Sequence, residues 1–88
     1  PLNTVFSMAN GDVEIVEIEV PPLMTGHKVS ELTVPGEIHM VSILRENRTI
    51  LPTMGTVLQK DDLLYIAVVV ASSGRLKRIF GLANGKGM

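Results

Sequence analysis

The chain has 88 residues, 45% of them hydrophobic, and a formal net charge of −1, which predicts one soluble globular domain near the lower size limit for a self-sufficient core. This balance leaves no basic stripe, and one tyrosine and two phenylalanines offer little for base stacking, so no nucleic acid partner is expected. Cysteine is absent, which excludes disulfides and thiolate metal sites and fits a reducing compartment.

Residues 1–11 are expected to form an N-terminal extension or linker, and a chain that starts with Pro1 rather than Met suggests excision from a longer protein. The longest apolar run, residues 63–71, is far shorter than the about 20 residues of a helical membrane span, so no direct membrane insertion is expected. A domain this small would gain from a dimer partner that covers part of its apolar surface.

The first clear strand pattern is DVEIVEIEV, residues 12–20, in which apolar and acidic residues alternate. The phase changes between Ile15 and Val16, so the strand either contains a bulge or is covered on both faces. Pro21 and Pro22 end it, because proline cannot donate to a β-ladder.

Residues 26–32, GHKVSEL, predict a short helix after a glycine turn, because Val29 and Leu32 are three positions apart. Pro35 and Gly36 end this helix.

Residues 38–44, IHMVSIL, predict a strand in a mostly buried environment, with the even positions on one side and the odd positions on the other. Glu46 and Asn47 then form a hairpin turn, since asparagine tolerates positive φ, and residues 48–51 return as the partner strand. The simplest interpretation of this charged tip is that it is solvated.

Residues 56–62 form a turn that leads into residues 63–71, LLYIAVVVA, which are predicted to be the central strand. Ser72 or Ser73 can cap a last helix, GRLKRIF, and residues 83–88 are expected to be a flexible tail. The predicted order within residues 12–82 is β-α-β-β-β-α, an α+β class in which a small, mainly antiparallel sheet carries two short helices.

An enzyme is not expected, because no glycine pattern of a nucleophile elbow surrounds any serine. No metal site is expected either: His27 and His39 lie twelve positions apart, and Asp61 with Asp62 is interpreted as a tight turn whose carboxylates bond to local amides.

The best candidate for ligand chemistry is the pair His39 and Arg45. Six positions separate them, so on a regular strand both side chains lie on one face, where imidazole and guanidinium could hold a phosphate or a carboxylate. The alternative is an arginine paired with a strand glutamate and a histidine packed at the rim of the sheet.

Four segments together resemble one family: GHKVSEL-TVP, IHMVSILRENRTILP, TVLQKDDLLYIAVV and RLKRIFG. Their order and separations over residues 13–82 resemble the TrkA-C (RCK C-terminal) domain family. The matching positions are Gly26, Val29, Glu31, Leu32, Pro35, Val41, Ile43, Arg45, Ile50, Pro52, Leu58, Asp62, Leu64, Leu76, Phe80 and Gly81. One departure is Asp61, where family members usually have glycine.

The resemblance implies a cytoplasmic domain that is membrane-associated through its partner and regulates a potassium channel or transporter. It also implies a homodimer attached to an RCK N-terminal, Rossmann-like domain that binds nucleotide, so NAD or ATP binding is not assigned to these residues. Two alternatives remain: the same domain attached to another cation, anion or amino-acid transporter, or a purely structural dimerisation module.

The resemblance further implies a ligand site. Some relatives bind cyclic di-AMP in the dimer cleft through the loop that here spans residues 32–40, so Pro35, Ile38, His39 and Met40 are candidate contacts together with Arg45. Those relatives use polar and basic groups in the loop, whereas this chain offers only His39, so cyclic di-AMP is not the favoured ligand and another small ligand stays open.

Overall fold

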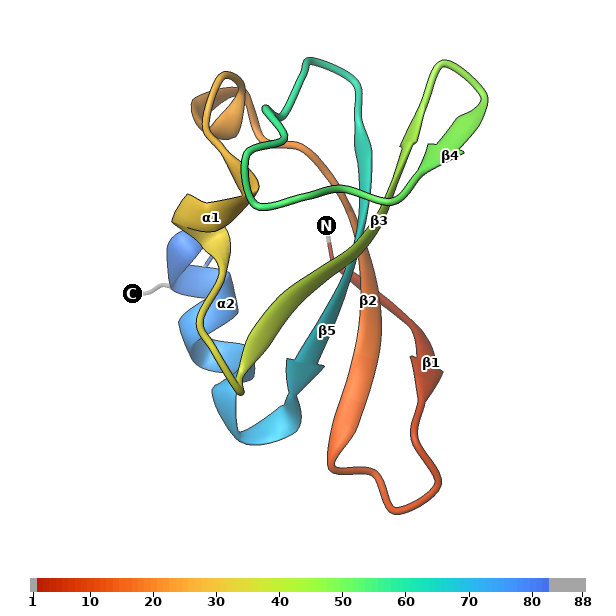
Figure 1. Cartoon of the computed structure of the whole chain (residues 1–88). Helices are drawn as coiled ribbons and strands as arrows, with labels where there is room; N and C mark the ends of the chain where they lie inside the picture. Colours follow the sequence, from red (N-terminus) through yellow and green to blue (C-terminus); the bar gives the residue numbers. More distant parts are fainter. Residues whose placement is uncertain (1, 83–88) are drawn as a thin grey trace.

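The fold is a five-stranded antiparallel sheet with its helices on one face (Figure 1). The computed structural model describes residues 2–82, and the tail expected at residues 83–88 lies outside this part. The elements are β1 (Asn3–Ser7), β2 (Val13–Glu19), α1 (Val29–Leu32), β3 (Ile38–Arg45), β4 (Arg48–Ile50), β5 (Leu63–Val69) and α2 (Ser73–Ile79), with 3-10 turns at Pro22–Met24 and Val70–Ser72. The predicted α+β class is therefore confirmed.

Strand β1 is absent from the predicted element order, because residues 1–11 were expected to be an extension or linker. It pairs with β2 at one edge of the sheet, and all five of its residues are exposed. Ladder hydrogen bonds rather than buried side chains hold this strand, so no hydrophobic alternation marks it in the sequence. The observed order begins with an additional strand, while the domain boundary at residue 12 stays a prediction.

Strand β5 is the centre of the sheet, as predicted, and the order across the sheet is β1-β2-β5-β3-β4. Its residues Leu64, Ile66 and Val68 are buried on the helix side. Strand β2 pairs with β5 in unbroken register, so the bulge considered for residues 12–20 is wrong. The irregular register lies in β1 instead, between Thr4 and Phe6.

Strand β3 contains a bulge that the sequence analysis did not predict. Met40 lies opposite Ile66, and Ser42 lies opposite Tyr65, the neighbour of Ile66 in β5. Val41 therefore has no partner residue in β5 and is the extra residue of the bulge. Ile38 and Ile43, an odd number of positions apart, are consequently both buried. The regular alternation predicted for residues 38–44 is therefore wrong.

The bulge also separates the two side chains that were expected to share a face. His39 lies opposite Ala67, on the face away from the helices, whereas Arg45 follows Ile43 by two positions and lies on the helix side. His39 and Arg45 thus lie on opposite faces of β3. The hairpin turn after Arg45 is confirmed, with positive φ at both Glu46 (49°) and Asn47 (65°).

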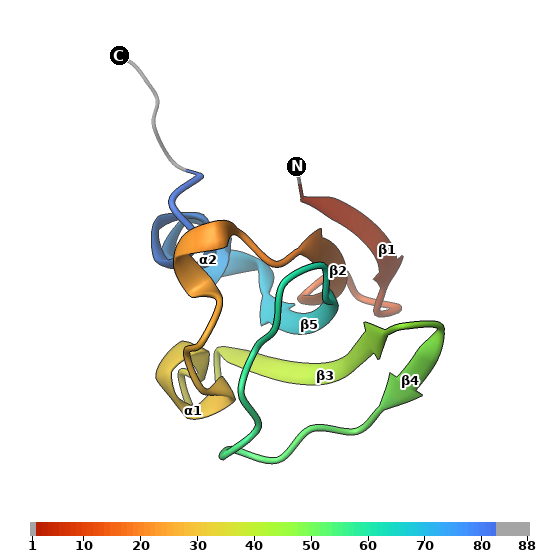
Figure 2. The ribbon, with the colours of Figure 1, turned by 90° about the horizontal axis from the view of Figure 1, so that it is seen from above.

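The core lies between the sheet and the two helices, which Figure 2 shows on the same side of the sheet. Its buried hydrophobic residues are Val16, Ile18, Val20, Val29, Leu32, Ile38, Ile43, Leu58, Leu64, Ile66, Val68, Leu76 and Phe80. Ser72 precedes α2 as predicted, but its hydroxyl donates to Glu37 at 2.8 Å instead of capping the helix. Within residues 2–82, no helix has the length and apolar run needed to cross a membrane.

Candidate ligand pocket

A pocket of about 330 Å³ lies along the part of β3 that β4 leaves uncovered, since β4 pairs only with residues 43–45. One wall is α1 with the loop that follows it, and the opposite wall is the loop after β4, which passes beside α1 (Figure 2). The lining residues are Val29, Thr33, Pro35, His39, Met40, Pro52, Thr53 and Met54.

Helix α1 has only four residues, too few to be stable alone, and its first turn is fixed by Glu31. The Lys28 N–H donates to Glu31 Oε2 at 2.8 Å, and His27 Nδ1 lies 2.7 Å from Glu31 Oε1. These two hydrogen bonds, the backbone bond first, hold the pKa of Glu31 below its ordinary value. His27 therefore acts on the helix start and does not line the pocket.

The loop after β4 supplies the carbonyl groups that the start of α1 needs. The first N–H groups of a helix have no partner within the helix. Here the Val29 N–H donates to the Thr56 carbonyl and the Ser30 N–H donates to the Met54 carbonyl, both at 2.9 Å. Within the loop, Thr56 Oγ1 accepts the Thr53 N–H at 2.9 Å. Each pocket wall thus depends on the other for its backbone hydrogen bonds.

His39 is the polar group at the mouth of the pocket. Its Nε2 accepts the Gly36 N–H at 3.0 Å, a bond that requires the neutral ring to carry its proton on Nδ1. Gly36 has φ of +77°, a conformation that suits glycine in the turn before β3. The other polar side chains are Thr33 and Thr53, and the remaining walls are valine, proline and methionine. This lining suits a flat, weakly polar group such as a nucleobase better than a bare phosphate.

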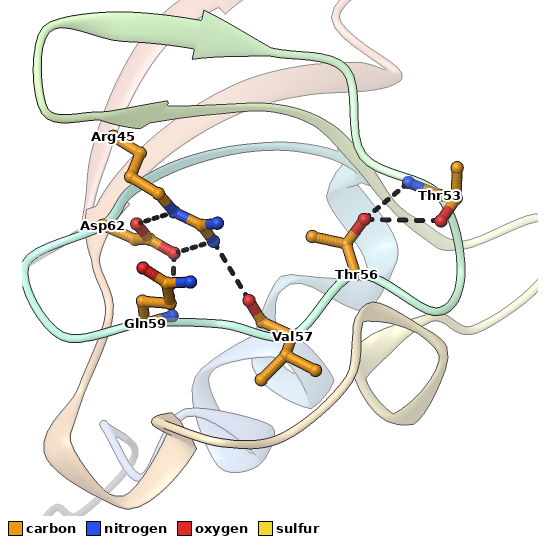
Figure 3. Close-up of polar contacts among 6 residues, drawn as sticks. All are labelled: Arg45, Thr53, Thr56, Val57, Gln59 and Asp62. Carbon is orange, nitrogen blue, oxygen red and sulfur yellow. Dashed lines mark hydrogen bonds and ion pairs between the residues drawn. The ribbon is translucent and has the colours of Figure 1, made fainter.

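Arg45 makes a different kind of contact, with Asp62 and with Val57 of the loop after β4 (Figure 3). Its Nε donates to Asp62 Oδ1 at 2.8 Å, and its Nη2 donates both to Asp62 Oδ2 at 2.7 Å and to the Val57 carbonyl at 3.0 Å. Of the two interpretations of Arg45 from sequence, the ion pair is the observed one, with an aspartate in place of a strand glutamate.

Asp62 is fully buried, with a side-chain exposure of 0%. Its Oδ2 also accepts the Gln59 N–H at 2.8 Å, as expected for a turn aspartate. Burial alone would raise the pKa of this carboxyl, but the hydrogen bonds from Arg45 and Gln59 outweigh it and hold the pKa of Asp62 below its ordinary value. Asp61, beside it, has a positive φ of 71°.

The structure brings together three of the five predicted contact residues: Pro35, His39 and Met40. Ile38 is buried in the core at 1% exposure, and Arg45 is occupied by Asp62, so neither lines the pocket. The wall formed by residues 52–54 was missed. One signal could have indicated it: no side chain that accepts hydrogen bonds stands at residue 28, so the start of α1 needs acceptors from elsewhere.

Two further hollows contain none of the predicted residues. One of about 500 Å³ lies between β1, β2 and α2, and another of about 430 Å³ lies beside Glu19 and Asp61. Among residues 2–82, no group of three or more His, Asp or Glu side chains is placed to hold a metal ion.

The fold of this chain is similar to that of a solved RCK domain. A solved chain described as "Structure of RCK domain with cda" superposes with a TM-score of 0.61 at 24% sequence identity, covering 75% of this chain and 96% of that one. The fold is thus that of an RCK domain. No curated protein sequence matches significantly.

The family follows from the sequence profile of the TrkA-C domain, which matches residues 13–81. The chain belongs to the TrkA-C (RCK C-terminal) domain family, and the resemblance read from the four sequence segments is confirmed. Domains of this family are regulatory and non-catalytic, and they generally form part of RCK assemblies that work with K⁺ transporters.

Proposed function

We propose that this chain is the cytoplasmic, ligand-sensing and dimerising domain of a regulator of potassium transport, and that its ligand binds in the pocket between α1, β3 and the loop after β4. The observation that carries the proposal is the position of this pocket on residues 32–40, the loop that the family resemblance implicates in ligand binding. We name cyclic di-AMP as the first ligand to test, since the similar RCK domain was solved "with cda".

The size and openness of the pocket support a site shared by two copies. About 330 Å³ lies at the lower end of the roughly 300–1,000 Å³ that ligand sites occupy, enough for one nucleotide half. Cyclic di-AMP has two identical halves, so two copies of the same pocket across a two-fold axis would hold both.

The exposed surface of the loop after β4, which supplies one wall of the pocket, supports the same arrangement. Three large apolar side chains are exposed on the loop after β4: Leu51 (82%), Met54 (53%) and Val57 (42%). A second copy that packed on this loop would bury them and would cover the pocket wall that the loop forms.

Regulation would then act through the seam between the copies. A ligand that touches both protomers favours the dimer arrangement to which it binds more tightly. The difference in its affinity for the two arrangements sets the upper limit on how far the ligand can shift the attached transporter from one state to the other. The proposal that the attached transporter carries potassium, rather than another cation, an anion or an amino acid, rests on the family alone.

A second candidate function is a dimerisation module without a ligand. It is favoured by the lining of the pocket, which contains no Lys or Arg to pair with the phosphates of a nucleotide. Under this proposal the exposed apolar residues of the loop after β4 serve assembly only.

Calorimetric titration with cyclic di-AMP tests the first proposal, with AMP and cyclic di-GMP as competitors. We expect His39→Gln to weaken binding by roughly tenfold, about 1.4 kcal/mol, while His27→Gln, which keeps a donor for Glu31 outside the pocket, leaves it unchanged. No heat from any nucleotide together with a persistent dimer would favour the assembly module, and equal effects of the two variants would place the site elsewhere.

A further inference from the structure

The pocket wall after β4 is an exposed loop with little packing of its own. Thr53, Met54, Gly55 and Val57 are exposed, and the first fully buried side chain after β4 is Leu58. The shape of this wall must therefore come from hydrogen bonds at its boundaries. On one side these are the bonds to α1, and on the other side they come from Arg45 (Figure 3).

We propose that Arg45 is a positioning residue for the pocket: it fixes the loop of residues 52–58 in the shape that receives the ligand, without touching the ligand itself. The inference rests on the proposed function of the pocket. It assigns to Arg45 a role different from the direct contact that the sequence predicts.

The geometry of the guanidinium supports this role. One Nη2 group donates at once to Asp62 Oδ2 and to the Val57 carbonyl, so a single rigid side chain ties the loop to the buried carboxylate. Asp62 in turn accepts the Gln59 N–H, which fixes the chain after Val57. Arg45 thereby links β3 to Val57 and, through Asp62, to Gln59 directly after this loop.

Several observations argue against direct contact with the ligand. Arg45 does not line the pocket, its side chain is only 21% exposed, and it lies on the face of β3 opposite His39. Its Nε and Nη2 are both engaged by partners within the chain.

From Val57 the connection continues to the other wall. Val57 forms an isolated bridge with Lys28, directly before α1. The preceding residue, Thr56, accepts the Val29 N–H. If the Val57 carbonyl were released, the acceptors that hold the first turn of α1 would become mobile, and both walls of the pocket would loosen together.

Arg45→Lys is the sharpest variant, because an ammonium keeps the positive charge for Asp62 but lacks the planar fork that also reaches Val57. Ile18→Val serves as a control, since it lowers stability at a buried site of β2 that does not line the pocket. Arg45→Ala is added at low temperature only if it folds.

Two measurements are made on each variant: amide hydrogen exchange of Val29, Ser30 and Leu58 without ligand, and the Kd for cyclic di-AMP well below the unfolding temperature. We expect Arg45→Lys to accelerate exchange at these amides by about tenfold and to weaken binding by roughly 2- to 30-fold. We expect Ile18→Val to change neither by more than about twofold at that temperature.

Each other outcome has a definite meaning. Unchanged amide exchange in Arg45→Lys overturns the inference. The inference is also overturned if Arg45→Ala binds the ligand more weakly while Arg45→Lys binds it as tightly as the unmodified chain, because only the positive charge would then matter. If the unmodified chain binds no nucleotide, the proposed function fails, while the exchange data still decide whether Arg45 fixes this loop.

Discussion

Asp62→Asn is the substitution whose effect can be worked out most directly from the structure. Asparagine has nearly the same shape, so no cavity forms, but its amide cannot accept from both Arg45 Nε and Nη2 as the carboxylate does at 2.8 and 2.7 Å. Removing one partner of a buried ion pair costs about 3–5 kcal/mol. Because Arg45 retains 21% exposure and water can reach it, we expect the lower end, about 3 kcal/mol.

This loss is large for a small domain. Total stabilities of about 5–15 kcal/mol are usual, and each 1 kcal/mol lowers the melting temperature of a 60–100-residue domain by roughly 4–8 °C. Asp62→Asn should therefore lower it by about 12–24 °C in a thermal scan. Asp61→Asn is the matched control, since Asp61 is exposed and asparagine also tolerates its positive φ; it should change stability by less than about 0.5 kcal/mol.

The same substitution has a signature in pH. The pKa of Asp62 is lower in the folded chain than in the unfolded chain, so its stabilisation is complete above the unfolded value of about 3.9 and is lost as pH falls through the lower folded value. Urea unfolding in a series from about pH 6 to pH 3 should show a smaller acid-side loss in Asp62→Asn than in the unmodified chain. The reasoning is refuted if Asp62→Asn loses less than about 1 kcal/mol, the range of exposed ion pairs, or keeps the full acid-side loss.

Three further predictions test other parts of the structure. Leu51→Asp, on the loop after β4, should weaken dimerisation by roughly tenfold or more in sedimentation analysis. Leu23→Asp, at the same 82% exposure but on the 3-10 turn Pro22–Met24, should not, and equal effects would contradict the proposed dimer contact. Asp61→Gly should raise stability by about 1 kcal/mol in urea unfolding, because glycine adopts a φ of 71° without strain, and a loss would show that the Asp61 side chain matters. The hydrogen bond from the Tyr65 hydroxyl to Glu17 Oε2 at 2.6 Å raises the pKa of Tyr65. The stabilisation of the fold by this bond is therefore present below the unfolded-state pKa of about 10 and is lost as pH rises through the pKa of Tyr65 in the folded chain. Ultraviolet titration of this single tyrosine should give a pKa closer to 10 in Glu17→Gln, and an unchanged pKa would contradict the bond.

The sequence predicts the elements whose own side chains are buried. Strand β5 was placed correctly because a run of β-branched and aliphatic residues forms the centre of a sheet, and α1 because Val29 and Leu32 both face the core. Strand β1 could not be predicted, since its residues are exposed and its stability comes from pairing with β2. Alternation marks burial, and β1 has none.

Three of the candidate contact residues line the pocket, and its other wall could not be predicted for a related reason. Pro35, His39 and Met40 lie on a loop that the family resemblance indicates, whereas the wall of residues 52–54 is joined to α1 by the backbone bond from the Ser30 N–H to the Met54 carbonyl. Such bonds depend on carbonyl groups, which every residue carries, so no residue type identifies them in the sequence.

The bulge at Val41 explains why His39 lines the pocket and Arg45 does not, although both belong to one strand. A regular strand would place these residues on the same face, and Arg45 would then lie on the side away from Asp62 and the loop of residues 56–62. The extra residue turns the later half of β3, so that Ile43 enters the core and Arg45 reaches the buried carboxylate, while His39 stays at the pocket mouth. No glycine or proline marks the bulge, because its cause is tertiary: both Ile38 and Ile43 are buried, and only an added residue between them allows that. One strand can thereby line the pocket at its start and hold the opposite wall at its end.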